Sequence, residues 1–205
     1  MKERPILFSG EMVRAILDGR KTMTRRVATK IKAPKAWTMP NGIDSFWNVN
    51  PCWRETPGEL CPYGKPGDRL WVREAFAVGL SNQEGIAYRA TSKWYDFEDG
   101  TPESFKEIKW KPSIFMPRRY SRITLEITNI HVERLQYISE EDAKREGVES
   151  NFDEGVVYYG PLNKGHADAR IAFSWLWDSI NAKRGYSWES NPWVWVVEFK
   201  RVLNG

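Results

Sequence analysis

The chain has 205 residues, 41% of them hydrophobic, and its 11 Trp, 9 Phe and 8 Tyr carry too much apolar surface for a disordered chain. The chain contains no run of 18 apolar residues, so no membrane span is predicted. The apolar stretch at residues 6–8 is too short for a secretory leader, and two cysteines are too few for a disulfide framework, so we expect a cytoplasmic protein. The net charge of +4 is compatible with a polyanionic partner.

The first third of the chain predicts a short strand, a helix and an irregular insertion. A strand over residues 4–8 precedes a helix over 10–18, because four apolar residues share one helical face before Gly19. Residues 21–27 follow as a strand or extended rim segment. Residues 28–66 are rich in Pro and Trp and have no regular period, which predicts an aromatic-rich insertion.

The rest of the chain is dominated by alternating apolar residues. Four further strands are predicted, at residues 68–78, 86–90, 121–134 (with a bulge near 129) and 193–202. A second aromatic-rich insertion is predicted at residues 91–111. Strands with few helices between them favour an α+β fold containing a small mixed β-barrel with flanking helices, in one domain over residues 1–205.

Two helices are predicted near the C-terminus. The first begins at Ser139, which has Asp142 at the capping-box position, and ends at Gly147. The second covers residues 166–183. Its predicted apolar stripe consists of Ile171, Ala172, Trp175, Leu176, Ser179 and Ile180.

The charges are distributed unevenly. Residues 1–36 contain ten Lys and Arg against three Asp and Glu, whereas residues 139–155 contain seven acidic residues against two basic ones. This asymmetry is typical of a face that binds nucleic acid. It is equally compatible with two surfaces that pair with each other, and the sequence leaves both alternatives open.

The densest polar cluster follows Gly19. It comprises Arg20, Lys21, Thr22, Thr24, Arg25 and Arg26. Arginines can hold a phosphate or a carbonyl in planar, bidentate contacts, and a desolvated lysine can act as a base. A solvated basic hairpin is the alternative.

Five segments together resemble a known family. They are ILFSGEMVRAILDGRKTMTRRV, CPYGKPGDRLWVREAF, SRITLEIT, ISEEDAKREGV and NPWVWVVEFKRV. They resemble the ASCH domain family, and more closely its phage- and prophage-encoded members. The resemblance implies a PUA-like fold and a role involving RNA or nucleosides, in a bacterial host cell if the gene is carried by a phage.

Some ASCH proteins are amidohydrolases that remove the acetyl group from 4-acetylcytidine with a lysine, a threonine and a glutamate. The resemblance assigns these roles to Lys21 as base, Thr24 as nucleophile and Glu146 as the group that orients the lysine or protonates the leaving amine. A threonine hydroxyl needs such a base, and burial beside arginines lowers the pKa of a lysine. Residues 21 and 24 face opposite sides of a regular strand, so they converge only if Lys21 lies in the turn before it.

Other residues are candidates for substrate binding. Within the polar cluster they are Arg20, Thr22, Arg25 and Arg26. Elsewhere they are Glu74, for which an arginine pair is the alternative, and Arg118 and Arg119, for which a charged strand edge is the alternative.

No metal or cofactor is predicted. Cys52 and Cys61 are nine residues apart, which is not the spacing of a zinc knuckle, and only His131 and His166 could join them. The chain has no Walker A or dinucleotide motif. Three functions remain: an amidohydrolase on an acylated pyrimidine nucleoside, a module that binds RNA or a modified base without chemistry, and a ribonuclease.

Overall fold

The computed structural model describes residues 1–29, 61–79, 85–93, 108–153, 156–161 and 165–202. Most of the two predicted insertions, 28–66 and 91–111, lies outside the described residues. The insertions, and the single domain over residues 1–205 that includes them, therefore stay predictions.

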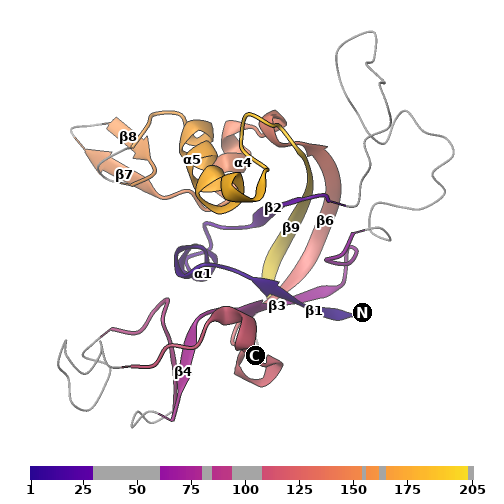
Figure 1. The fold of residues 1–205 in the computed structure, drawn as a ribbon, viewed down its shortest axis with the longest axis vertical. Helices are drawn as coiled ribbons and strands as arrows, with labels where there is room; N and C mark the ends of the chain where they lie inside the picture. The colour runs from indigo at the N-terminus through magenta and orange to yellow at the C-terminus, as the bar shows by residue number, and fades with distance from the viewer. Residues whose placement is uncertain (30–60, 80–84, 94–107, 154–155, 162–164, 203–205) are drawn as a thin grey trace, which may run out of the picture.

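A five-stranded sheet forms the centre of the molecule (Figure 1). Its strands, in spatial order, are β1 (Glu3–Leu7), β3 (Arg69–Arg73), β6 (Thr124–Arg134), β9 (Trp193–Val202) and β2 (Met23–Val27). The β1–β3 pair is parallel and the other pairs are antiparallel. These elements make the fold a mixed one, with sheets and few helices.

The predicted closed barrel is not observed. β1 and β2 are the two edges of the sheet, and no pairing joins them in the part of the chain that the structure describes. The segment between these strands includes α1 (Gly10–Leu17), and a cavity lies beside both edges, lined by Leu7 of β1 and by four residues of β2.

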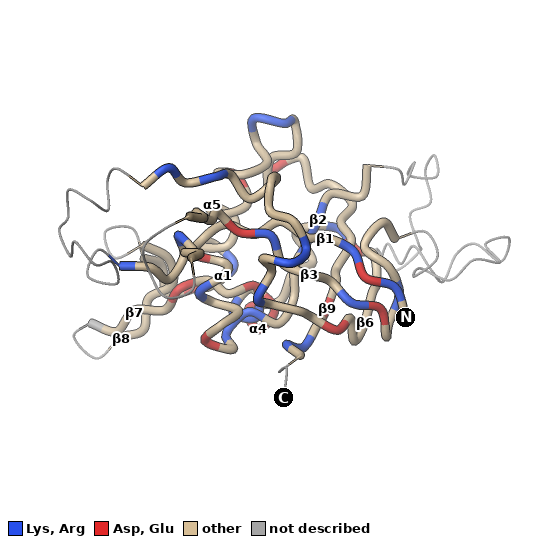
Figure 2. The backbone as a smooth tube through the Cα atoms, turned by 90° about the horizontal axis from the view of Figure 1, so that it is seen from below, with Lys and Arg blue, Asp and Glu red and all other residues tan. Residues whose placement is uncertain are grey.

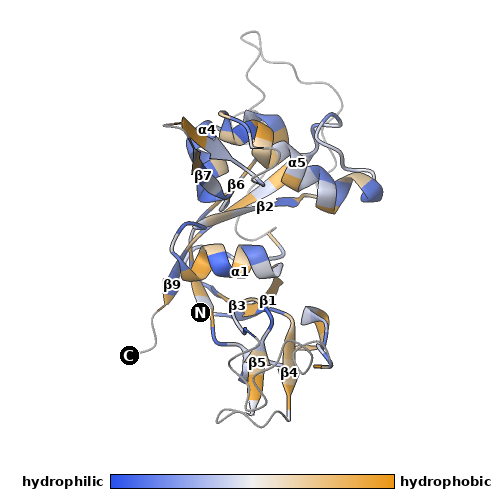
Figure 3. Cartoon of the chain, turned by 90° about the vertical axis from the view of Figure 1, so that its left-hand side faces the viewer, coloured by the Kyte–Doolittle hydropathy of each residue, from blue (hydrophilic) through white to orange (hydrophobic). Residues whose placement is uncertain are grey.

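The bulge predicted near residue 129 is confirmed. The register between β6 and β9 shifts between Ile127 and Asn129, which face Phe199 and Glu198 respectively. A bulge bends a strand and increases its twist. The two long strands curve together through the molecule and carry the sheet from one half to the other (Figures 1 and 3).

Serine side chains cap two of the helices; the cap at Ser139 was predicted, and the cap at Ser9 was not. The Ser9 hydroxyl accepts a hydrogen bond from the main-chain N–H of Met12 at the start of α1, and Ser139 does the same for Asp142 at the start of α4 (Glu140–Arg145). The third helix, α5 (Ala169–Asn181), begins three residues later than predicted, because His166 instead forms a β-bridge with Tyr159.

The predicted stripe of α5 is only partly buried. Ile171, Trp175 and Ile180 are exposed, whereas the buried face consists of Ala169, Ala172, Phe173, Trp177 and Asn181. Periodicity identifies an apolar face but does not tell whether it meets a core or a cavity. Trp175 and Ile180 line cavities, which explains their apolar character.

Two apolar cores lie on either side of β2 and β9. One packs α1 beneath the sheet, around Val13 and Leu70, and the other packs α4 and α5 above it, around Phe173 and Trp177 (Figure 3). Small two-stranded sheets extend both halves: β4 (Phe76–Val78) with β5 (Ile86–Tyr88), and β7 (Ser150–Asp153) with β8 (Val156–Tyr159). The β7–β8 hairpin was not predicted.

Short 3₁₀ turns complete the described elements: η2 (Ser113–Phe115), η3 (Arg118–Tyr120), η4 (Leu135–Tyr137) and η5 (Ala182–Arg184). Among the described residues, no helix has both the length and the hydropathy needed to cross a bilayer.

Candidate active site

Lys21 lies in the segment between α1 and β2, before the strand begins at Met23. Its main-chain N–H donates to the oxygen of Ala15, and that of Thr22 donates to the oxygen of Arg145 at the end of α4, each over 2.9 Å. These bonds hold the segment between two helices. Lys21 is therefore not subject to the alternation of the strand, which is the condition for convergence stated above.

The side chain of Lys21 is completely buried against Glu146. Its Nζ donates to both Oε2 and the main-chain oxygen of Glu146, at 2.7 Å each, and lies 5.6 Å from the centre of the Phe8 ring. Burial lowers the pKa of Lys21; Glu146 opposes this, and the charges of Arg26 and Arg25 add to it. The ammonium thus gives up its proton more easily than a lysine in water.

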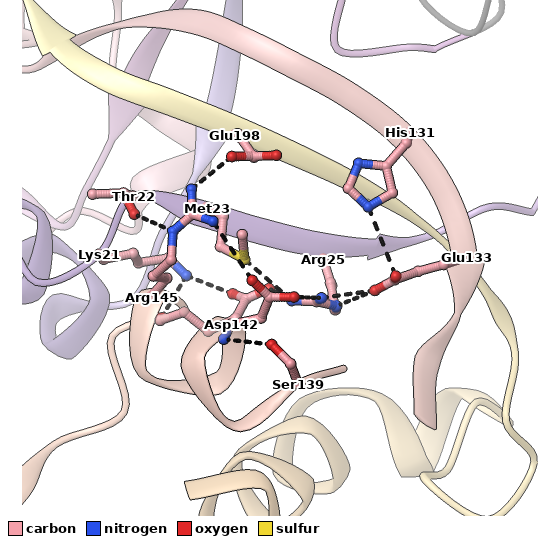
Figure 4. Close-up of polar contacts among 11 residues, drawn as sticks. Lys21, Thr22, Met23, Arg25, His131, Glu133, Ser139, Asp142, Arg145 and Glu198 are labelled. Carbon is pink, nitrogen blue, oxygen red and sulfur yellow. Dashed lines mark hydrogen bonds and ion pairs between the residues drawn. The ribbon is translucent and has the colours of Figure 1, made fainter. Parts of the chain in front are cut away.

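Arg25 holds the other oxygen of the same carboxylate. Its Nη1 lies 3.4 Å from Glu146 Oε1, while Nε and Nη2 lie 2.9 and 2.7 Å from Glu133 Oε1, and Nη2 lies 3.2 Å from Asp142 Oδ2. Figure 4 shows this guanidinium between Glu133 and Asp142, with His131 beyond Glu133. These carboxylate contacts fix the Arg25 guanidinium, so we describe Arg25 as a positioning residue; because Arg25 also lines the cavity described next, its predicted contact with a substrate stays a prediction.

A cavity of about 400 Å³ opens beside this network, between β2, α1 and α5. Thr24 and Glu146 both line it, as does Arg26. Thr24 is buried, and its hydroxyl makes no hydrogen bond to another residue that the structure describes. Cavities of this size accept small organic ligands of nucleoside dimensions.

Arg20 and Thr22, which flank Lys21, do not line this cavity. Arg20 contacts Asp18 and the main-chain oxygen of Gly147, and the Thr22 hydroxyl accepts a hydrogen bond from Arg145 at 3.2 Å. Arg20 instead lines a second cavity of about 830 Å³ between α1 and α5.

The structure does not bring three other candidates to the cavity. Glu74 is buried in a bidentate ion pair with Arg122, at 2.9 and 3.0 Å, which is the alternative anticipated for it. Arg118 pairs with Glu3 at 3.0 Å, and the guanidinium of Arg119 lies 4.8 Å from the ring of Tyr120. All three lie in the half of the molecule that contains β1 and β3.

The basic N-terminal segment and the acidic 139–155 segment contact each other directly. Lys21 and Arg25 pair with Glu146 and Asp142 of the acidic segment. Figure 2 shows acidic positions interspersed among the basic ones along the chain. The pairing of two charged segments, left open as an alternative, is therefore what the structure contains at this site.

Sequence reasoning missed the wall of the cavity that α5 supplies. Phe173, Trp177 and Asn181 line it at a spacing of four residues, and Arg184 follows in η5. That spacing was a usable signal. Tyr63 also lines the cavity, and only the position of residues 61–67 in space reveals its role.

Comparisons with protein-family models and with curated protein sequences find no match. Among solved structures, this chain is similar to the crystal structure of an ASCH domain from Lactobacillus crispatus JV V101. The two are 16% identical, the match covers 98% of this chain and 79% of that chain, and the TM-score is 0.41.

Proposed function

We propose that the protein hydrolyses the amide bond of an N-acylated pyrimidine nucleoside, with 4-acetylcytidine as the reference substrate. The observation that carries the proposal is the desolvated Lys21–Glu146 pair, in which Lys21 is fully buried behind Glu146 and Glu146 lines a cavity that Thr24 also lines. A buried ion pair beside a cavity, in which burial lowers the pKa of the lysine, is typical of a functional site. The resemblance to phage-encoded ASCH proteins and a cytoplasmic location belong to the same proposal.

The chemistry assigns one role to each group. Lys21 passes its proton to Glu146 when the bound substrate excludes water, which leaves a neutral amine and a neutral acid. The neutral amine of Lys21 then takes the proton of the Thr24 hydroxyl, while the oxygen of that hydroxyl bonds to the acyl carbon. The acid of Glu146 protonates the exocyclic nitrogen as the C–N bond breaks, and water hydrolyses the resulting acyl ester on Thr24.

Arg25 supports this chemistry from behind the carboxylate. It fixes one oxygen of Glu146 so that the other stays within 2.7 Å of the lysine. Its own geometry is set by Glu133 and Asp142. Groups held this rigidly favour a reaction because they need no reorganisation during it.

The experiment is a product assay on the purified full chain. Incubation with 4-acetylcytidine should release cytidine and acetate, separated by chromatography, and Lys21→Met should lower the rate at least about a hundredfold because the base is lost. Absence of cytidine release by the unmodified protein, or an undiminished rate in the folded Lys21→Met variant, contradicts the proposal.

Binding without hydrolysis is the second candidate. It is favoured by the complete burial of the Lys21 ammonium, which two oxygens of Glu146 already occupy. In that case the cavity holds RNA or a modified base unchanged. A salt titration of binding to single-stranded RNA tests this function, because phosphate contacts lose affinity steeply as salt rises.

A further inference from the structure

Two arginines of the cavity wall have no carboxylate partner among the described residues. Arg26 donates a hydrogen bond from Nη2 to the main-chain oxygen of Leu7 over 2.7 Å and lies 5.2 Å from the centre of the Phe8 ring. Its Nε is buried without a hydrogen-bond partner in the part of the chain that the structure describes. Arg184, at the end of η5, is exposed at the rim.

The positive charges of Arg26 and Arg184, which both line the cavity, repel each other. Burial lowers the pKa of Arg26; Tyr63 and Glu146 oppose this, and the charge of Arg184 adds to it. The carboxylate of Glu146 offers them little compensation, because Lys21 and Arg25 already hold both of its oxygens. The wall therefore carries an excess of positive charge, and the Arg26 Nε is a buried donor without a hydrogen-bond partner among the described residues.

We propose that Arg26 and Arg184 bind a phosphate group, so that the ligand of this cavity is a nucleotide rather than a free nucleoside. The inference rests on the function proposed above, since the acylated base would then occupy the Thr24 side of the same cavity. Guanidinium groups bind phosphate oxygens through paired N–H donors, which matches the unoccupied donor of Arg26. The phosphate comes either from a free nucleotide or from the backbone of an RNA strand.

The cavity volume agrees with this ligand. About 400 Å³ is enough for a pyrimidine, a ribose and one phosphate together. A bound phosphate also gives a role to Arg184, which the Lys21–Glu146 chemistry does not use, and a ligand contact to Arg26 beyond its effect on the pKa of Lys21. Asn181 and Tyr63 complete the polar part of the same wall.

The test compares ligands that differ by a phosphate. Calorimetric titrations of the full chain use cytidine, cytidine 5′-monophosphate and a short single-stranded RNA containing cytidine. We expect the monophosphate to bind at least about tenfold more tightly than cytidine, with the difference shrinking as salt rises. Tighter binding of the RNA than of the monophosphate assigns the phosphate to a strand, and weaker binding assigns it to a free nucleotide; either result supports the site.

Substitutions of single basic residues test where the phosphate binds. Arg184→Gln should remove about tenfold of the preference for the monophosphate over cytidine, and Arg26→Lys should weaken that preference because lysine lacks the planar pair of donors. Lys183→Gln is the matched control, since it removes the same charge from the adjacent exposed residue, which does not line the cavity. Its preference should equal that of the unmodified protein.

Equal affinities for cytidine and its monophosphate, or an equal loss in Lys183→Gln and Arg184→Gln, overturn the inference. Hydrolysis of 4-acetylcytidine without a phosphate preference overturns it as well and leaves the proposed function standing. A phosphate preference without hydrolysis supports the site and removes the proposed function. The two proposals therefore fail separately.

Discussion

A single buried ion pair, Lys21 with Glu146, gives this protein its most distinctive chemistry. Removing two charges from water costs more than an average contact returns, so such pairs contribute little to stability. Here the lysine is fully buried, both carboxylate oxygens are occupied, and an arginine closes the network. This pair, whose glutamate lines the cavity, is the basis of the proton transfer proposed above.

The position of Gly147 makes this pair sterically feasible. Gly147 has φ +86°, and a Cβ built there would lie 2.9 Å from the Cβ atoms of both Ala15 and Lys21. We predict that Gly147→Ala lowers the free energy of unfolding by about 2–4 kcal/mol, from backbone strain plus overpacking. Urea denaturation measures this loss.

Gly185→Ala is the matched control for that substitution. Gly185 has φ +84°, but a Cβ there would have no neighbour within 4 Å. Its substitution should therefore cost only the backbone strain, about 1–2 kcal/mol. If Gly147→Ala and Gly185→Ala lose the same free energy of unfolding, residue 147 is not packed tightly against Lys21 and Ala15.

At the scale of elements, two helices complete a site that begins on a strand. α4 brings Glu146 to Lys21, and α5 supplies the opposite wall of the cavity. The parallel β1–β3 pair forms the other edge of the sheet. Asp68, the residue before β3, holds the beginnings of these two strands together. The Asp68 carboxylate accepts hydrogen bonds from the main-chain N–H of Lys2 at 2.7 Å and from the side chain of Arg4 at 2.9 Å.

Asp68 should make the stability of this edge depend on acidity. The main-chain N–H of Lys2 and the side chain of Arg4 lower its pKa from 3.8 to about 2. The folded state thus binds fewer protons than the unfolded state, so this contribution is present above pH 3.8 and is lost as the pH falls through about 2. Comparing the stability of Asp68→Asn with the unmodified protein between these pH values should show a difference that shrinks with acid; a constant difference contradicts it.

The sequence predicted the positions of strands better than it predicted which charged residues pair and which apolar residues stay exposed. Alternation located β3, β6 and β9, apolar spacing before Gly19 located α1, and the cap at Ser139 located α4, because these signals are local. The sequence resemblance suggested Lys21, Thr24 and Glu146 as one set, and the structure brings Lys21 onto Glu146 and places Thr24 and Glu146 at one cavity.

Long-range pairing could not be predicted from the same signals. Glu74 is a strand-end carboxylate like many catalytic ones, and only the fold shows that Arg122 neutralises it. The exposed Ile171 and Trp175 look like core residues by spacing. Whether a curved sheet closes into a barrel depends on the relative placement of β1 and β2, which no local pattern encodes.

On the scale of the whole molecule, the candidate site lies between two apolar cores. These cores lie on either side of β2 and β9 (Figure 3), and the cavity lies beside β1 and β2, the edges of the sheet in the part of the chain that the structure describes. The cavity collects residues from segments as distant as Leu7 and Arg184.

The most direct test of this account is the effect of Thr24→Val on cytidine release from 4-acetylcytidine. Valine keeps the shape of the buried side chain and removes only the hydroxyl. Thr124→Val, a similarly buried threonine on β6 that does not line the cavity, controls for the substitution itself. The account predicts a loss of at least about a thousandfold in Thr24→Val and an unchanged rate in Thr124→Val. A folded Thr24→Val protein that still releases cytidine at the unmodified rate would contradict it.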